Sequence, residues 1–523
     1  MKKTILFIFC LMISLSISKI NAETITVSSS STSVDTVGSL LHAIANAASG
    51  DIIEFNLDED SISIAAQCNF PVAKTITVDG LNKKNGNRII FKPTDAYAGR
   101  GFEIATLNQA GVVTFADVIF RNCIFTGFKL SSIRNNGSLV LENCLFKDNG
   151  KGKTNGGAMF VNTPCIIRNC VFDGNKSIGE SRGGGAIYAA KIGARVEIES
   201  STFINNETDN QGGVMWIADG TVVKISNSTF VGNKAAKATD KAEAGKGGVI
   251  VATIINDHTD LSRPAPQIYI VNSTFAGNEA ENGAGAIQMI AGINKMNIWM
   301  VNSIVAYNYS GTGYNDIAEE NKTETIGAIK PLNIIYGSAN TEFVTRATTE
   351  KGCQKIDYAT DVVLFSEMET ITGTSLKRPV IQSVDNVQVA LLAANSIAIN
   401  KGTNSIPGDF ENTEAIVIPT KDQLGITRPE VPAIGAIEFA PVNSVSETTN
   451  DKPQLWICNK TLFIKGLNSP SRIDTYNLNG QLLRSFIQNN DGSVQMHDVH
   501  SNQFIIIRLT NSRLSETYKA IIR

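Results

Sequence analysis

The sequence has 523 residues, 42% of them hydrophobic and 18% charged, and a formal net charge of −3 at pH 7. A slightly acidic chain lacks the basic surface that nucleic-acid binding requires, so no nucleic-acid partner is expected. The length exceeds one ordinary hydrophobic core, and 43 glycines favour an elongated repeat over several separate globular domains.

The first 22 residues are predicted to be a secretory signal peptide. Two lysines precede an apolar run from Ile5 to Ile17, and Ala22 stands before a polar segment. The run is shorter than a membrane-spanning helix, and this layout is typical of a cleaved export signal. We therefore expect a secreted protein whose mature chain starts near Glu23.

An amphipathic helix followed by a strand is predicted in "VGSLLHAIANAASGDIIEFNL", residues 37–57. Leu40 and Ile44 fall on one helical face, and Gly50 ends the helix. A repeat protein needs such a cap, because its first unit would otherwise expose an apolar cross-section. The segment resembles the N-terminal cap of bacterial right-handed β-helix proteins, so residues 23–110 are expected to hold the cap and the first coils.

One short pattern recurs along the middle of the chain, with apolar residues two and four positions before a central Asn and a Phe three positions after it. Successive copies lie 21 to 45 residues apart, which is the spacing of a solenoid. The seven copies are "VIFRNCIF" (118–125), "LVLENCLF" (139–146), "CIIRNCVF" (165–172), "VEIESSTF" (196–203), "VKISNSTF" (223–230), "IYIVNSTF" (268–275) and "IWMVNSIV" (298–305).

The central Asn is predicted to be a corner between two short strands. Side chains alternate between the two faces of a strand, so inward residues on both sides of the Asn at this spacing require a break of parity there. Stacked corners would place the amides about 4.8 Å apart, within hydrogen-bonding reach of one another. Solvent-exposed turn asparagines are the alternative. The predicted ladder comprises Asn122, Asn143, Asn169, Asn227, Asn272 and Asn302, with Ser200 at the remaining corner.

The residue after the corner is Cys in the first three copies and Ser in the next four. Cys123, Cys144 and Cys170 are expected to be small interior residues that pack as free thiols. A disulfide between adjacent rungs is the alternative.

Two further elements flank the copies. The Phe opens a turn such as "FKDN" or "FVGN", and a variable loop leads to "GGAI" or a close variant. The glycines permit a tight entry into a third strand, so each unit is one coil. These paired elements resemble the polymorphic outer-membrane protein repeat over about residues 120–310, which implies bacterial surface exposure and adhesion. Residues 111–440 are predicted to form a right-handed, single-stranded parallel β-helix, a pectate-lyase-like solenoid.

The third strand offers a candidate binding face. The residue after each inward position should point outward, and three such residues on consecutive rungs are aromatic. Aromatic faces stack well on the apolar faces of sugars, so a groove for a glycan or a partner protein is predicted there. Burial of the rings by the variable loops is the alternative. The candidate binding residues are Phe160, Tyr188, Trp216 and Gln288.

A polysaccharide lyase or glycoside hydrolase acting on acidic polysaccharide is the enzymatic alternative. Such enzymes need paired carboxylates, or a base beside acidic calcium ligands, on an outward strand face. The outward residues of the third strand are neutral, so no catalytic residue, metal site or cofactor is predicted, and loop calcium is left open. The other charged groups are His258 with Asp257, Asp260 and Arg263, Asp117 with Arg121, and Glu180, Asp209, Asp240 and Glu243.

The segment "DQLGITRPEVPAIGAIEF", residues 422–439, resembles the closing segment of the same β-helix proteins. Asp422 and Arg428 are expected to form a structural ion pair at the last coil, with a functional site as the alternative. The matching positions are Asp422, Gly425, Arg428, Gly435, Ala436 and Glu438. Residues 311–395 lack the repeated pattern, but their apolar runs are consistent with further coils.

A polar linker at residues 441–453 precedes a region of short strands at 454–523. Asn479-Gly480 between two apolar runs indicates a hairpin. "YNLNGQLL" from Tyr476 and "QFIIIRL" near the end resemble the C-terminal β-sandwich sorting domain of the type IX secretion system. This resemblance implies a small antiparallel β-sandwich that contacts the outer-membrane secretion machinery of a bacterium of the Bacteroidetes type.

The sequence therefore predicts a secreted, monomeric, cell-surface protein associated with the outer membrane. Its expected role is that of a non-catalytic adhesin that binds a polysaccharide or a host or cell-surface protein. A passive surface coat without a defined ligand is a further alternative.

Overall fold

The chain divides into two compact units, Met1–Phe439 and Ala440–Arg523. The computed structural model describes residues 22–109, 112–178, 182–238, 243–254, 264–291, 296–311, 313–321, 327–360, 362–384, 386–408, 410 and 415–439 of the first unit. In the second unit it describes residues 454–458, 461–465, 470–477, 481–489, 492–496, 503–510 and 515–522.

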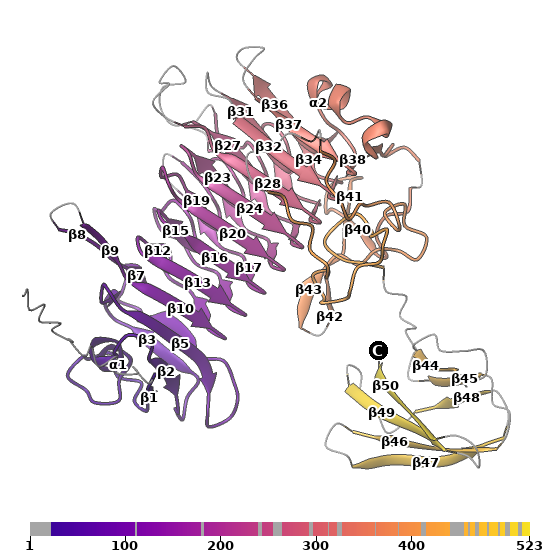
Figure 1. Cartoon of the computed structure of the whole chain (residues 1–523), viewed down its shortest axis with the longest axis horizontal. Coiled ribbons are helices and arrows are strands. Elements are labelled where there is room, and N and C mark those ends of the chain that lie inside the picture. Colours follow the sequence, from indigo (N-terminus) through magenta and orange to yellow (C-terminus); the bar gives the residue numbers. More distant parts are fainter. Residues whose placement is uncertain are drawn as a thin grey trace, which may run out of the picture. The chain divides into compact units, whose positions relative to one another are not determined.

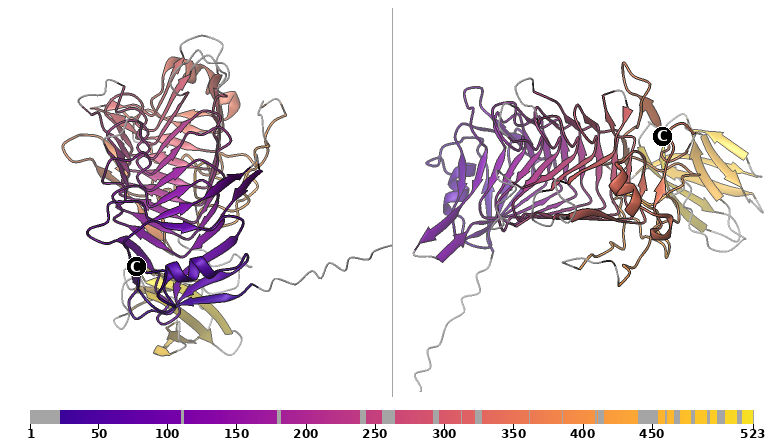
Figure 2. Two further views of the ribbon diagram at one scale, coloured as in Figure 1. Left: turned by 90° about the vertical axis from the view of Figure 1, so that its left-hand side faces the viewer. Right: turned by 90° about the horizontal axis from the view of Figure 1, so that it is seen from above.

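The first unit is a right-handed parallel β-helix whose coils each contribute one strand to each of three long sheets (Figures 1 and 2). The first sheet, here sheet A, has 11 strands among the described residues. In spatial order they are β1 (Thr24–Val27), β2 (Ile52–Phe55), β5 (Thr75–Asn82), β10 (Asp117–Arg121), β13 (Ser138–Glu142), β16 (Cys165–Arg168), β20 (Arg195–Glu199), β24 (Val222–Ser226), β28 (Gln267–Val271), β32 (Met296–Val301) and β37 (Gly327–Leu332).

Sheet B takes the strand that follows each sheet A strand from β2 onward. Its described strands are β3 (Ser61–Ile64), β6 (Ile90–Pro93), β11 (Ile124–Thr126), β14 (Leu145–Lys147), β17 (Val171–Asp173), β21 (Thr202–Ile204), β25 (Thr229–Val231), β29 (Thr274–Ala276), β33 (Ile304–Ala306), β38 (Ile335–Tyr336) and β39 (Gln354–Lys355). A short sheet D follows it, with β18 (Lys176–Ser177), β22 (Glu207–Thr208), β26 (Lys234–Ala235), β30 (Glu279–Ala280), β34 (Tyr309–Ser310) and β35 (Gly313–Tyr314).

Sheet C completes the coil and leads back to sheet A. Its described strands are β36 (Ile317–Asn321), β31 (Ile287–Ala291), β27 (Ile250–Thr253), β23 (Met215–Ala218), β19 (Ile187–Ala189), β15 (Met159–Val161), β12 (Ile133–Asn135), β7 (Phe102–Ile104) and β4 (Cys68–Phe70). A hairpin of β8 (Thr106–Gln109) and β9 (Val112–Phe115) projects between β7 and β10.

The predicted cap helix is α1 (Leu40–Asn46), between β1 and β2. The Ser39 side chain accepts a hydrogen bond from the backbone N–H of His42 at 3.1 Å, so it caps the first turn. Leu40 and Ile44 are buried against the first coil, as the helical periodicity predicts.

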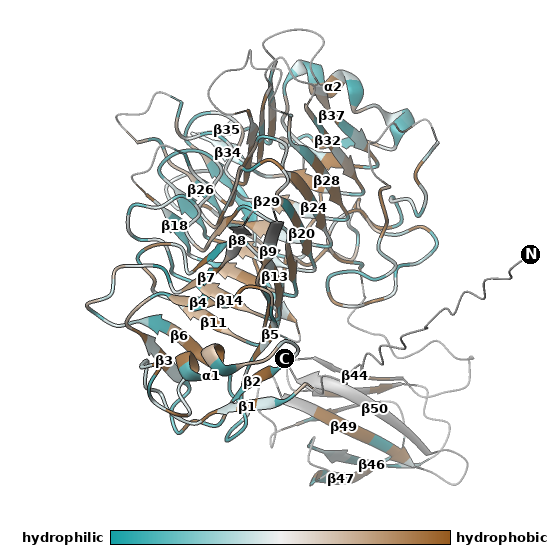
Figure 3. Ribbon diagram, turned by 60° about the vertical axis from the view of Figure 1, so that its left-hand side comes forward, coloured by the Kyte–Doolittle hydropathy of each residue, from teal (hydrophilic) through white to brown (hydrophobic). Residues whose placement is uncertain are grey.

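The core is a stack of inward side chains in register from rung to rung. The phenylalanines of sheet B from Phe125 to Phe275 stack face to face, with centroids 4.5 to 4.8 Å apart. This spacing is set by the distance between neighbouring strands, so each coil aligns the next. Hydrophobic colour follows the strands of the coils, and hydrophilic colour lies mainly in the surrounding turns (Figure 3).

Every predicted corner between sheets A and B has a left-handed backbone. The φ angles at these seven residues run from 47° to 58°, and Asn333 continues the column at 49°. Asn adopts this conformation more readily than most residues, because its short side chain can hydrogen-bond locally. The parity break predicted at the corner is therefore present.

A second Asn column, which was not predicted, forms a continuous buried ladder. It lies three residues after the Phe of five copies and three residues after Val305 of the last copy. Each amide nitrogen donates to the side-chain oxygen of the next rung, at 2.7 to 2.9 Å, and to a buried carbonyl of the preceding rung. The ladder comprises Asn149, Asn175, Asn206, Asn233, Asn278 and Asn308, all fully buried.

The ladder ends on the buried carboxylate of Asp316. Asp316 Oδ1 accepts from the backbone N–H and the side-chain amide of Asn308, both at 2.8 Å. Its Oδ2 accepts from the Ser338 N–H at 2.7 Å and from the Tyr358 hydroxyl at 2.6 Å. Burial raises the pKa of Asp316 to about 6, although these hydrogen bonds oppose the shift.

The pKa of Asp316 predicts that the β-helix is more stable in mild acid. The folded-state pKa exceeds the value of about 4 for an unfolded Asp, so between these values the folded protein holds the extra proton. The free energy of unfolding should therefore fall by about 2 kcal/mol as pH rises from about 4 to about 7. Urea unfolding of the wild type and Asp316→Asn at both pH values isolates this contribution; an unchanged difference between the two proteins would contradict it.

After β39 the chain leaves the coils and folds back over sheet B. We call residues 362–439 the strap. The last coil is closed by α2 (Thr341–Arg346) and the short helix η1 (Thr349–Lys351). The strap carries two hairpins, β40 (Met368–Thr370) with β41 (Lys377–Pro379) and β42 (Gln382–Val384) with β43 (Val387–Val389). Of residues 311–395, only the first part therefore forms further coils.

The second unit contains two antiparallel sheets in its described residues. One has the order β44 (Gln454–Cys458), β45 (Thr461–Lys465), β48 (Gly492–Gln495). The other has the order β47 (Leu482–Gln488), β46 (Ser471–Tyr476), β49 (Gln503–Thr510), β50 (Ser515–Ile522). Side chains from both sheets, including Leu462 and Ile507, form one buried cluster, which is the packing of a β-sandwich. The predicted hairpin dipeptide Asn479-Gly480 lies outside the described residues.

Candidate functional site

The three predicted aromatic residues stack on consecutive rungs of sheet C. The Phe160 and Tyr188 ring centroids are 4.7 Å apart, and those of Tyr188 and Trp216 are 5.2 Å apart with an interplanar angle of 5°. Gln288 continues the same column, because Trp216 pairs with Val251 and Val251 pairs with Gln288. The predicted register is therefore present.

The prediction that this column is an open binding face is wrong, because most of it is buried. Trp216 is 1% exposed, Tyr188 is 9% exposed and Gln288 is fully buried. The Trp216 indole nitrogen donates to Gln211 Oε1 at 3.2 Å, and the Arg182 guanidinium lies 5.2 Å from its ring centroid. The chain leading into sheet C thus folds over the rings, and their stacking contributes to packing.

A groove of about 340 Å³ instead crosses the outer face of sheet A. Its floor is built by the outward side chains of β16, β20, β24 and β28. The strap supplies the facing wall, where Val417 is 74% exposed. The floor residues are Ile166, Arg168, Glu197, Glu199, Lys224, Ser226, Tyr269 and Val271, and the wall residues are Ala415, Ile416, Val417 and Pro419.

The groove carries both signs of charge above an apolar base. Arg168 lies between Glu142 and Glu199, at 3.5 and 3.4 Å. Lys224 Nζ lies 5.7 Å from the ring centroid of Tyr269, which is 3% exposed. Half-exposed ion pairs contribute little to stability, so Arg168 can exchange its carboxylate partners for a ligand at small cost.

The predicted corner amides divide into two groups. Asn143 and Asn169 are exposed, whereas Asn227, Asn272 and Asn302 are buried beneath the strap. Along the stack, Asn143 Nδ2 donates to the side-chain oxygen of Asn122 at 2.7 Å. Asn227 and Asn302 instead bind the strap, and the side-chain amide of Asn272 is buried without a hydrogen-bond partner among the described residues. The corner column is therefore not a continuous ladder in this part of the chain.

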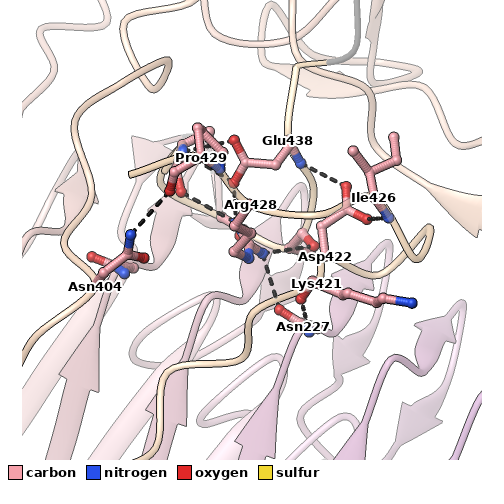
Figure 4. A network of polar contacts seen from close by, with 12 residues as sticks. Asn227, Asn404, Lys421, Asp422, Ile426, Arg428, Pro429 and Glu438 are labelled. Atoms are coloured by element: carbon pink, nitrogen blue, oxygen red, sulfur yellow. Dashed lines mark hydrogen bonds and ion pairs between the residues drawn. The ribbon is translucent and has the colours of Figure 1, made fainter. Parts of the chain in front are cut away.

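The closing segment forms a buried polar network over the middle of the β-helix (Figure 4). Arg428 pairs with Glu438, and its guanidinium also donates to Asn227 Oδ1 at 2.9 Å and to the carbonyls of Gly435 and Ala436 at 3.1 and 3.2 Å. Burial lowers the pKa of Arg428 and raises that of Glu438. The arrangement is that of a structural ion pair.

Asp422 is not the direct ion-pair partner that the sequence suggested. Its Oδ1 accepts from the backbone N–H groups of Leu424 and Ile426, and its Oδ2 from the N–H of Glu438 at 2.8 Å. Asp422 therefore shapes the turn, and Glu438 takes the place beside Arg428.

The predicted thiol column is buried and unbridged. Cys123, Cys144 and Cys170 are free and at most 1% exposed. The Cys144 N–H donates to Cys170 Sγ at 3.4 Å, and the Cys170 N–H donates to Ser201 Oγ at 3.1 Å. Sulfur and hydroxyl thus occupy one structural position, and burial raises the pKa of the Cys123 and Cys170 thiols.

Several predicted loop groups lie outside the described residues, namely Glu180, Asp240, Asp257, His258, Asp260 and Arg263. In the described part of the chain, Asp117 is the first residue of β10 and Arg121 is its last. Arg121 pairs with Asp79 at 3.0 Å. Glu243 pairs with Lys246 at 2.7 Å. Within the same residues, no cluster of three His, Cys, Asp or Glu side chains suits a metal ion, and no helix is long and apolar enough to cross a membrane.

One comparison with known proteins agrees with the repeat. Residues 169–190 match the Chlamydia polymorphic membrane protein repeat, a stretch that holds a corner Asn, "FDGN" and "GGAI". Among solved structures, the chain is similar to the pectate lyase Pel9A, with 16% sequence identity and a TM-score of 0.34, over 80% of this chain and 97% of that chain. It matches no curated protein. The resemblance of the "FxxN" and "GGAI" elements to this repeat is thereby confirmed for residues 169–190.

Proposed function

We propose that this protein is a secreted, non-catalytic binding protein of the bacterial surface, and that the sheet A groove is its binding site. The observation that carries the proposal is the groove itself, in which a charged rim surrounds an apolar base. Ligand sites combine these features, because apolar area supplies affinity while a few polar groups fix orientation. The rigid coils hold the floor, and the strap holds the facing wall.

Three features support a surface location. The repeat over residues 169–190 is similar to one of a membrane protein family of the cell surface. Residues 1–22 have the layout of an export signal. The C-terminal unit has two antiparallel sheets, and its sequence motifs resemble those of a type IX sorting domain. We therefore assign it to export or anchoring at the outer membrane.

Groove variants test the proposal. Wild-type protein, in its full mature length, is applied to a glycan array and to a phage library of random peptides. Arg168→Ala and Lys224→Ala are each expected to weaken binding of the selected probe about tenfold, because each removes a charge from the rim. Lys92→Ala, an exposed lysine on sheet B, is the control and should bind normally. A folded wild type that binds nothing would favour a passive surface coat.

The groove is also where the charged side chains of an enzymatic site would lie, if the protein were an enzyme. Glu197 and Glu199 project from the same face of β20, and Lys224 pairs in register with Glu197 on the next strand. A positioned basic group beside carboxylates is able to carry out acid–base chemistry. Incubation with acidic polysaccharides followed by ultraviolet absorbance of unsaturated products distinguishes the two functions. Product release that is lost in Lys224→Ala would replace the binding function with a lyase.

A further inference from the structure

The corner asparagines are the means by which the coils hold the strap. Asn227 Nδ2 donates to the carbonyl of Lys421 at 2.7 Å, and Asn333 Nδ2 donates to that of Lys401 at 3.0 Å. Asn302 binds both backbone groups of Thr403, donating to its carbonyl at 2.7 Å and accepting from its N–H at 2.9 Å. Three corners thus bind the backbone of irregular chain segments, independently of those segments' side chains.

Asn169 presents the same group without a strap above it. Its φ of 53° is close to the 47° of Asn227 and the 48° of Asn302, so the three corners share one left-handed backbone conformation. Unlike those two buried residues, Asn169 is exposed. The neighbouring Asn143 is also exposed, but its amide donates to Asn122.

The strap covers the sheet B side chains beside its corners through both polar and apolar contacts. In the covered outward column, Ile304 and Ile335 pack with apolar strap residues, and three threonines hydrogen-bond the strap. These are Thr202 to the Gln388 carbonyl, Thr229 to Gln423 Oε1 and Thr274 from the Ala436 N–H.

In the uncovered coils the same column is aliphatic. Leu145 and Val171 are half-buried on sheet B, and Val140 and Ile166 are half-buried on sheet A, on the other side of the corner. Ile166 also lines the groove. The uncovered surface therefore has an aliphatic centre on both sheets, with the ion pairs Arg168–Glu142 and Lys147–Asp173 at its margins. It is continuous with the strap-covered face on sheet B and with the groove on sheet A.

The size of this surface limits its occupant. Three rungs extend about 14 Å along the axis, and the two strand faces together about 20 Å across it, which gives roughly 300 Å². A stable interface between folded proteins buries about 800 Å² on each partner. The patch is therefore too small for a dimer of this chain and matches a single segment of polypeptide.

We propose that a linear, aliphatic peptide segment of a partner protein binds across the Asn169 corner in the manner of the strap. Its backbone carbonyl accepts a hydrogen bond from Asn169 Nδ2, and its side chains cover Ile166 and Val171. The proposal rests on the proposed function and names its ligand class, because the segment continues into the groove past Arg168. Because the hydrogen bond is made to backbone, peptides of different sequence should bind this site, just as the other corners bind strap segments of different sequence.

Two probes test this binding mode on the full mature chain. One is a fluorescent peptide with the strap sequence "AIVIPTK", residues 415–421, and the other is the random peptide library. Asn169→Gly is expected to weaken binding of both probes at least fivefold. Asn143→Gly is the matched control and should leave binding unchanged, because its amide is already engaged with Asn122. Glycine suits both corners, since it adopts left-handed backbone without strain. A photo-reactive group on the peptide should cross-link to residues 140–171.

The outcomes separate the two proposals. Peptide binding that is equal in wild type and Asn169→Gly, or cross-links confined to other coils, would overturn the binding mode. Glycan binding that depends on Lys224, with no peptide binding, would overturn it as well but leave the groove as the binding site. If neither probe class binds the folded protein, the proposed function fails together with its ligand class.

Discussion

Replacement of Asn233 by alanine should destabilise the β-helix by about 3 to 5 kcal/mol. The Asn233 amide donates to the Phe203 carbonyl and to Asn278 Oδ1, both at 2.9 Å, and its oxygen accepts two hydrogen bonds from Asn206 at 2.9 and 3.0 Å. Truncation leaves four buried polar atoms short of a partner. Each such loss costs about 1 to 3 kcal/mol, and the total is less than the sum because neighbouring amides rearrange.

Asn162→Ala is the matched control. Asn162 is half-buried at the edge of sheet C and donates one hydrogen bond, to Asn136 Oδ1 at 2.7 Å. Its loss should cost about 1 kcal/mol or less, because water replaces the lost partner. Urea unfolding followed by the fluorescence of the buried Trp216 and Trp299 compares the two variants. Equal destabilisation would mean that a buried ladder amide contributes no more to the free energy of unfolding than a half-buried amide at the surface.

The face of each strand residue could be predicted from the sequence, because strand alternation is local. Ile225 and Phe230 lie inward from two different strands, and Asn227 turns the chain between them, as the parity count requires. The cap helix and the small interior thiols follow from equally local patterns. These features depend on a few neighbouring residues and on nothing distant in the chain.

The continuous amide ladder lies one turn beyond the corner column in which the sequence predicts it. The alternation of strand faces breaks twice in each repeat, first at the corner, as at Asn227, and again two residues after the Phe. There Gly232 makes a second left-handed turn with φ of 68°, which directs Asn233 into the interior. The amide of the "FxxN" element is therefore inside the coil, and the corner amide is on its outer surface.

The groove and the burial of the corner amides were beyond local pattern reading. Asn227 meets Lys421 across 194 positions of sequence, and Thr202 meets Gln388 across 186. The period of the repeat does not predict which coils a later segment of the chain will cover. The prediction that the aromatic column is exposed fails for a similar reason. The strand sets the position of Trp216, but the exposure of its ring depends on where the chain around Gln211 folds.

Replacement of Arg428 by methionine should detach the strap from the coils. The guanidinium is buried and binds Glu438, Asn227 and two backbone carbonyls. Methionine preserves much of the volume but leaves the Glu438 carboxylate buried without its cation, at a cost of about 3 to 5 kcal/mol. Because this cost falls on the strap, residues 362–439 should become sensitive to limited proteolysis while the coils resist it.

The control and the rescue decide whether the charge pair causes the effect. Arg378→Met removes the half-exposed strap pair with Glu369, at 2.7 Å, and should cost less than about 1 kcal/mol. Combining Arg428→Met with Glu438→Gln removes the unpaired charge and should recover part of the lost stability. Since the strap forms one wall of the groove, Arg428→Met should also weaken ligand binding, and the double variant should restore it in the same proportion. Proteolysis of the strap at wild-type rates in Arg428→Met would show that the corner amides, the threonines and the apolar contacts hold it on the coils without this ion pair.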